Sequence, residues 1–155
     1  MIDSQAASNI VLGIGASNIR YGGGITHITE ILSVADPQRN GFKKIIIWGS
    51  EDTLAKLPNV SWLEKISPAL LNQGLISRVI WQSLILAGAL RANKCDVLFA
   101  PGGSVIARFE PTVTMSRNLL PFESAELRRF GWSFRALRLN ILRNSQTLGF
   151  RSVQG

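Results

Sequence analysis

Residues 9–32 read NIVLGIGASNIRYGGGITHITEIL, and they contain the clearest indications of the fold. The apolar run at 9–15 ends in glycine, as expected for a buried strand. A loop rich in Gly, Ser and Asn follows and ends in Gly22-Gly23-Gly24. Apolar residues at helical spacing then predict a helix over 25–35, with Pro37 as a stop just beyond it. The stretch is therefore a strand, a glycine loop and a helix.

The same alternation continues along the chain. Further strands are predicted at 43–48, 61–66 (an exposed strand), 96–100 and 111–115, and further helices at 51–56 (capped by Ser50), 74–93, 124–130 and 133–150. In the helix at 74–93 the apolar residues of one side are Ile76, Val79, Ile80, Leu84, Ala87 and Leu90. Strands alternating with helices predict an α/β fold, a Rossmann-like parallel sheet with helices on both faces. Ligands of such sheets bind at the carboxyl ends of the strands, which here lead into loops 16–24, 101–104 and 116–122.

Length and composition indicate one cytoplasmic domain over 1–155. The chain has 155 residues, 46% hydrophobic and 17% charged, which suits a single compact core. No apolar run approaches the ~20 residues of a membrane span, and no secretory signal is evident. The single cysteine, Cys95, forms no internal disulfide and fits a reducing compartment.

Positive charge gathers in the last third of the chain. The formal net charge is +7, and that third holds Arg117, Arg128, Arg129, Arg135, Arg138, Arg143 and Arg151 against only Glu110, Glu123 and Glu126. Such clustering indicates an anionic lipid surface, a phosphorylated substrate or nucleic acid, or else a solvated face or one covered by another domain. No aromatic and basic stripe accompanies the charge, so a nucleic-acid partner is not expected.

The glycine motifs point away from dinucleotide chemistry. Gly13-Ile-Gly15-Ala-Ser-Asn18 begins like a dinucleotide fingerprint, but Asn18 stands where the third glycine belongs. Trp48-Gly49, with no acidic residue, ends the second predicted strand. A nicotinamide-dependent oxidoreductase is therefore not expected, and no phosphate loop with Lys-Ser/Thr is present.

The run Gly22-Gly23-Gly24 is a candidate anion site. Glycines at a helix start let the backbone approach a ligand closely, and the positive end of the helix favours an anion such as a diphosphate. The alternative is a flexible turn between strand and helix. His27, one turn into the helix, is either a functional group or a hydrogen-bonded structural residue.

Two further loops carry candidate binding residues. The amides of Gly102 and Gly103, with Ser104, can form a nest for an anion or a sugar hydroxyl, or a plain tight turn. Arg117 and Asn118 follow the next strand and suit a phosphorylated or polyhydroxylated ligand, although Asn118 also suits simple loop stabilisation. No metal-ligand set and no Ser/His/Asp arrangement can be assembled, so no catalytic residue and no cofactor are assigned.

At this point the chain resembles a known family. The segments that carry the resemblance are GGGITHITEIL (22–32), IIIWGSEDTLAKLP (45–58), WLEKISPALLN (62–72), CDVLFAPGGS (95–104) and PTVTMSRNLLPFE (111–123). In this order they resemble the N-terminal half of bacterial GT-B glycosyltransferases of family four, over nearly the whole chain from about Asn9 to Arg151.

The resemblance implies transfer of a sugar from a nucleotide-sugar donor to a glycan or lipid-linked acceptor, with retention of configuration and no bound metal. Gly22, Gly23 and Gly24 would approach the donor diphosphate, and His27 would be a signature position packed behind them. Gly102, Gly103, Ser104, Arg117 and Asn118 would lie on the acceptor side. Peripheral contact with the inner membrane is a further expectation.

Two departures from the family limit this expectation. Many relatives have a histidine where Phe99-Ala100-Pro101-Gly102-Gly103 ends the fourth predicted strand here. Residues 1–155 also contain nothing like the family's C-terminal half, which supplies the nucleotide pocket, a Lys/Arg pair and two glutamates separated by seven residues. The chain alone is therefore expected to show no transferase turnover. The alternative function is a non-catalytic module that binds glycans or anionic surfaces.

Overall fold

The structure, a computed structural model, describes residues 9–101 and 107–115. A five-stranded parallel sheet lies at its centre in the order β3-β2-β1-β4-β5. The strands are β1 (Ile10–Gly15), β2 (Phe42–Trp48), β3 (Leu63–Ile66), β4 (Val97–Pro101) and β5 (Thr112–Met115). All five follow the predicted apolar runs, each to within two residues. The α/β class and the parallel sheet are thereby confirmed.

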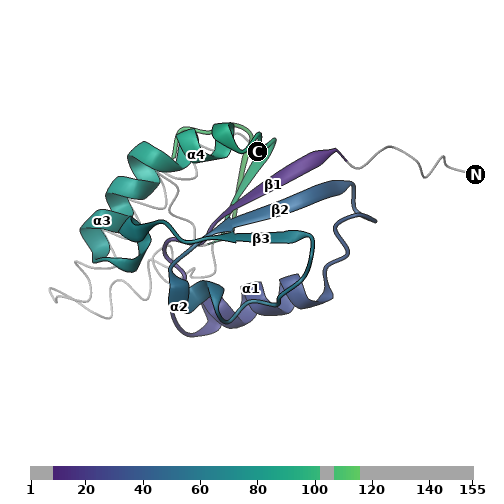
Figure 1. Cartoon of the computed structure of the whole chain (residues 1–155), viewed down its shortest axis with the longest axis horizontal. Helices are drawn as coiled ribbons and strands as arrows, with labels where there is room; N and C mark the ends of the chain where they lie inside the picture. The colour runs from purple at the N-terminus through teal and green to yellow at the C-terminus, as the bar shows by residue number, and fades with distance from the viewer. Residues whose placement is uncertain (1–8, 102–106, 116–155) are drawn as a thin grey trace, which may run out of the picture.

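Helices cover both faces of the sheet, as predicted. They are α1 (Gly23–Val34), α2 (Glu51–Leu54), the 3₁₀ turn η1 (Ala69–Asn72), α3 (Leu75–Ile80) and α4 (Leu86–Ala92). A π-helical turn, Trp81–Ile85, joins α3 to α4 without a break. Figure 1 shows α1 and α2 on one side of the strands and α3 and α4 on the other. Because the chain steps outward from β1 to β3 and then crosses back to β4, the strand order reverses between β1 and β4.

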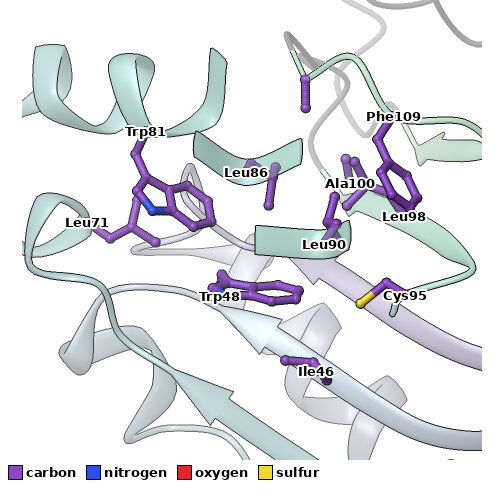
Figure 2. Packing of buried hydrophobic residues seen from close by; sticks show 11 residues of the cluster. Ile46, Trp48, Leu71, Trp81, Leu86, Leu90, Cys95, Leu98, Ala100 and Phe109 are labelled. Atoms are coloured by element: carbon purple, nitrogen blue, oxygen red, sulfur yellow. The ribbon is translucent and has the colours of Figure 1, made fainter. Parts of the chain in front are cut away.

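Alternate residues of the strands feed two separate cores. On the α1 side, Ile45 and Ile47 of β2 pack with Ile28 and Leu32 of the helix. On the other side, Ile46 and Trp48 of β2 pack with residues of η1, the π-turn and α4 (Figure 2). Both faces of β2 are thus buried, which explains its unbroken run of apolar residues.

Gly13 and Gly15 let α4 approach β1 closely. A Cβ atom on Gly13 would overlap Leu90 Cδ2 and lie 3.2 Å from the Trp48 ring and 3.3 Å from Cys95 Sγ. A Cβ atom on Gly15 would lie 3.4 Å from Leu86 Cδ2. These glycines therefore have a packing role against the helix, which accounts for the start of a fingerprint that lacks its third glycine.

Three local predictions need correction. Helix α1 begins at Gly23, two residues earlier than predicted. Of the three consecutive glycines, only Gly22 therefore precedes the helix. Ser50 occupies the N-cap position of α2, but its hydroxyl makes no capping hydrogen bond and instead lies 2.9 Å from the Thr53 hydroxyl. Strand β3 pairs only with β2, as an edge strand does, yet Leu63 is buried and the rest of it half-buried.

The buried side of the long helix differs from the predicted apolar side. Trp81, Leu86 and Leu90 face the sheet, spaced five and then four residues apart because the π-turn inserts an extra residue. Of the predicted apolar side only Leu90 is buried, while Ile76 is 76% and Leu84 75% exposed. We call the exposed large hydrophobic residues of this helix the outer strip. They are Leu75, Ile76, Val79, Ile80, Leu84 and Ile85.

The same helix is one candidate membrane span by length and composition. Leu75–Ala92 has 18 residues with a mean hydropathy of 1.3, although the sequence suggested no such segment. Within the described residues its inner side lies in the core, where Trp81 and Leu90 are almost fully buried. Packing against a sheet accounts for those apolar residues, but it does not account for the outer strip.

We predict that Gly13→Ala lowers the free energy of unfolding by about 1–3 kcal/mol, the usual cost of overpacking a filled core. Leu90 is fully buried and cannot swing away from the added methyl group. Gly88→Ala is the control, because nothing lies within 4 Å of a Cβ atom there. That change should stabilise the protein by about 1 kcal/mol through helix propensity. Urea unfolding measures both; equal stability of Gly13→Ala and wild type would contradict the close approach.

The buried Cys95 thiol generates a pH prediction. Burial, and after it the charge of Asp96, raises the pKa of this thiol from 9.0 to about 11. Above pH 9 the thiol ionises in the unfolded chain but stays protonated in the folded one, so the unfolded chain binds fewer protons and stability falls with pH. Between pH 9 and 11 the wild type should therefore lose more stability than Cys95→Ala in parallel urea titrations. Parallel pH profiles would show that the thiol pKa is not raised.

Candidate functional site

The candidate site is the loop that joins β1 to α1, at the carboxyl edge of the sheet. Residues 16–22 leave the end of β1, next to β4, where the strand order reverses. Open parallel sheets bind ligands at this position. Ala16, Ser17 and Ile19 are buried, whereas Tyr21 is 76% exposed. The loop therefore has an anchored beginning and an open end.

The buried hydroxyl groups of Ser50 and Thr53 anchor the loop to α2. Thr53 of α2, fully buried, donates a 2.6 Å hydrogen bond to the main-chain oxygen of Ile19, and its hydroxyl also meets that of Ser50. The main-chain N–H of Ala16 donates to Trp48 O at 2.8 Å, which continues the pairing of β1 with β2 past the strand end. Helix α2 is short, but it holds this loop in place.

The long helix reaches the loop with two polar side chains. Gln82, in the π-turn, is 4% exposed, and its side-chain oxygen accepts a 3.3 Å hydrogen bond from the Asn18 amide. Arg78 of α3 donates to the main-chain oxygen of Ser17 at 3.5 Å. In the opposite direction, Arg20 of the loop donates to Leu71 O in η1 at 3.4 Å. The loop is thus joined to the long helix through Gln82 and Arg78, and to η1 through Arg20.

The start of α1 has the geometry expected of a glycine-dependent turn. Gly22 has φ 68° and ψ −156°, a conformation that side chains other than hydrogen rarely permit. Its carbonyl accepts the N–H of Ile25 at 3.1 Å and of Thr26 at 3.5 Å. A Cβ atom on Gly22 or Gly23 would meet nothing within 4 Å. Unlike Gly13, these glycines face open space.

His27 lies on α1 one turn beyond this start, as predicted. It is half-buried, and its Nε2 atom is buried with no hydrogen-bond partner among the described residues. The bonded structural role is therefore not seen at Nε2. The chain has no other histidine.

The structure does not test every candidate. Gly102, Gly103, Ser104, Arg117 and Asn118 lie outside the described residues. Within 9–101 and 107–115, no group of three or more His, Cys, Asp or Glu side chains is placed to hold a metal ion. The sequence analysis missed Thr53, Gln82 and Arg78 as loop anchors. For Gln82 and Arg78 a signal existed, since both are large polar residues inside a mainly apolar helix.

We predict that Thr53→Val destabilises the fold and loosens the loop. Valine keeps the shape of threonine but leaves the buried carbonyl of Ile19 without its donor, which costs about 1–3 kcal/mol. Thr26→Val, at an exposed position of α1, is the matched control and should change stability by less than about 0.5 kcal/mol. Urea unfolding gives the first effect, and faster amide exchange over residues 16–22 gives the second. Unchanged exchange in Thr53→Val would mean that this hydrogen bond does not order the loop.

No family model matches this chain, and neither a curated protein nor a solved structure matches it. The fold, a Rossmann-like parallel sheet, carries many unrelated activities. The features that bear on the function of this chain are therefore the loop 16–22, the start of α1 and the charges beside them.

Proposed function

We propose that this chain is the acceptor-side domain of a nucleotide-sugar-dependent glycosyltransferase. The start of α1 would approach the donor diphosphate, and the carboxyl-edge loops would hold a glycan or lipid-linked acceptor. The donor-side domain, which binds the nucleotide, would be a separate unit. This enzyme would act in the cytoplasm, with a peripheral contact to the inner membrane.

One observation carries the proposal, namely the open start of α1 at the carboxyl edge. Twelve residues of helix direct their positive end at this point. Gly22 turns the chain into the helix, and open space lies where a side chain on Gly22 or Gly23 would be. An anionic group can therefore approach the first-turn backbone closely. A diphosphate fits this geometry. It is also the ligand that the resemblance of the glycine motif to family-four glycosyltransferases implies.

The remaining features support binding and not chemistry by this domain alone. Cys95 is buried, and the Nε2 atom of the lone histidine has no hydrogen-bond partner among the described residues. A transferase of two facing domains stabilises charge from both walls of its cleft. We therefore expect no turnover from residues 1–155 alone; sugar transfer by the pure protein would overturn the separation of donor and acceptor sides.

We predict that the full chain binds UDP-glucose, a representative nucleotide sugar, with a dissociation constant on the order of 1 mM, as one wall of a cleft would. Chemical-shift changes should centre on the amides of residues 22–26. Gly23→Val should abolish them, because its side chain would occupy the space where a Cβ atom meets nothing within 4 Å. Gly88→Val, at an equally open glycine of α4, should bind normally. Undiminished binding by Gly23→Val would contradict the proposed role of the helix start.

The outer strip favours a second candidate, a non-catalytic module that binds anionic surfaces. Ile76 and Leu84 are each about three-quarters exposed, and the helix that carries them holds two arginines and no acidic residue. This module would bind anionic lipid vesicles through the strip, with no response at residues 22–26 to a nucleotide sugar. The titration above separates the two functions.

A further inference from the structure

Two arginines meet where the loop after β1 contacts the start of the long helix. Arg20 reaches out of the loop to the main-chain oxygen of Leu71 in η1, at 3.4 Å. Arg78 reaches from α3 to the main-chain oxygen of Ser17 in the loop, at 3.5 Å, and to Gly74 O at 3.4 Å. Each guanidinium contacts the segment that carries the other, or the turn next to it. Both arginines therefore contact the main chain where the loop after β1 meets the start of the long helix.

Neither arginine is neutralised within the described part of the chain. The ion pair there joins Lys44 to Glu64, on β2 and β3, and no carboxylate lies within 4 Å of either guanidinium. The partners of both arginines are neutral carbonyls, at distances near the upper limit for a hydrogen bond. Because a guanidinium has five N–H donors, most of the donors of each remain available.

Two acidic residues of α2 lie on the chain segment that contacts the end of η1. They are Glu51 and Asp52, in the first turn of α2. Glu51 is already engaged with Asn72, whose side chain accepts the Glu51 N–H at 2.8 Å and donates to its carboxylate at 3.3 Å. Asp52 is exposed to solvent. Asn72 is a neutral partner, so Glu51 keeps its negative charge, but neither Glu51 nor Asp52 forms an ion pair with Arg20 or Arg78 in the described part of the chain.

Both arginine side chains are partly withdrawn from water. Arg20 and Arg78 are both half-buried, and a cation withdrawn from water without a counter-charge is unfavourable. The positive end of α1 begins three residues after Arg20, which adds to the same field. An anion at this junction would relieve that cost. Arginine's planar fork matches the oxygens of a phosphate in a way that a single ammonium does not.

We propose that Arg20 and Arg78 form a phosphate-binding site, distinct from the open start of α1. The ligand class is a phosphate monoester or diester, which two guanidinium groups can hold from two sides. Its assignment to the acceptor, as a lipid phosphate or a phosphorylated sugar, rests on the proposed glycosyltransferase function. The anion site itself does not.

The test is titration of the full chain with inorganic phosphate, glucose 1-phosphate and a short-chain prenyl phosphate, by calorimetry at low ionic strength. Arg20→Gln combined with Arg78→Gln should weaken binding of all three by about tenfold or more, as loss of charge-assisted bidentate contacts predicts. Arg20→Lys with Arg78→Lys keeps the charge and should give an intermediate loss. Tighter binding of the prenyl phosphate or of the sugar phosphate would identify the source of the phosphate.

Arg91→Gln is the matched control. Arg91 also donates to a main-chain carbonyl, Arg108 O at 3.2 Å, but it lies at the far end of α4. The Arg91→Gln variant should bind all three ligands like the wild type. Urea unfolding would confirm that every variant is folded. Equal loss in Arg91→Gln, or undiminished binding in the folded double Gln variant, would overturn the site.

The two proposals fail separately. Gly23→Val should lose UDP-glucose and keep inorganic phosphate, whereas the double Gln variant should do the reverse. If Gly23→Val behaves as expected and the arginine variants bind phosphate normally, the arginine site is wrong and the helix-start proposal stands. Loss of phosphate binding in the arginine variants, with no effect of Gly23→Val on UDP-glucose, would leave only the arginine site.

Discussion

The close approach of α4 to β1 determines the position of everything on that side of the sheet. Gly13 and Gly15 present bare backbone where Leu90 and Leu86 need space, so the helix lies lower over β1 than any side chain there would allow. The helix that is fixed in this way also carries Gln82 and Arg78, one and two turns before Leu86. Both side chains consequently reach the loop after β1. A packing constraint in the core thus sets the geometry of the carboxyl edge.

The sequence was sufficient for the strands because burial on both faces leaves a clear pattern. Runs such as KKIIIW (43–48) and DVLFA (96–100) have few alternatives in an α/β protein, and β2 and β4 occupy them. Helix ends were less certain. Gly23 and Gly24 read as loop residues, yet both lie in α1, because only Gly22 needs a positive φ to start it.

The buried face of the long helix could not be predicted from periodicity. A spacing of 3.6 residues places Ile76, Ile80 and Leu84 on one side, and that regularity is what the sequence offers. The π-turn adds one residue and directs Trp81 and Leu86 to the sheet instead. The loop anchors escaped prediction for a different reason. Thr53 meets Ile19 across 34 residues of sequence, and a contact of that separation has no local signature.

The glycine of β1 and the glycines at the start of α1 serve different purposes, and only the surroundings of each distinguish them. A methyl group on Gly13 would meet core atoms, so its absence serves packing. On Gly22 and Gly23 it would meet nothing, so its absence keeps space in front of a helix start. Thr53, Gln82 and the two arginines meanwhile hold the loop in its folded geometry. A ligand that binds an already ordered loop need not supply the free energy of ordering it, and more of its interaction energy remains as affinity. Because these four side chains order the loop in advance, an anion bound at this edge would meet hydrogen-bond donors already in fixed positions.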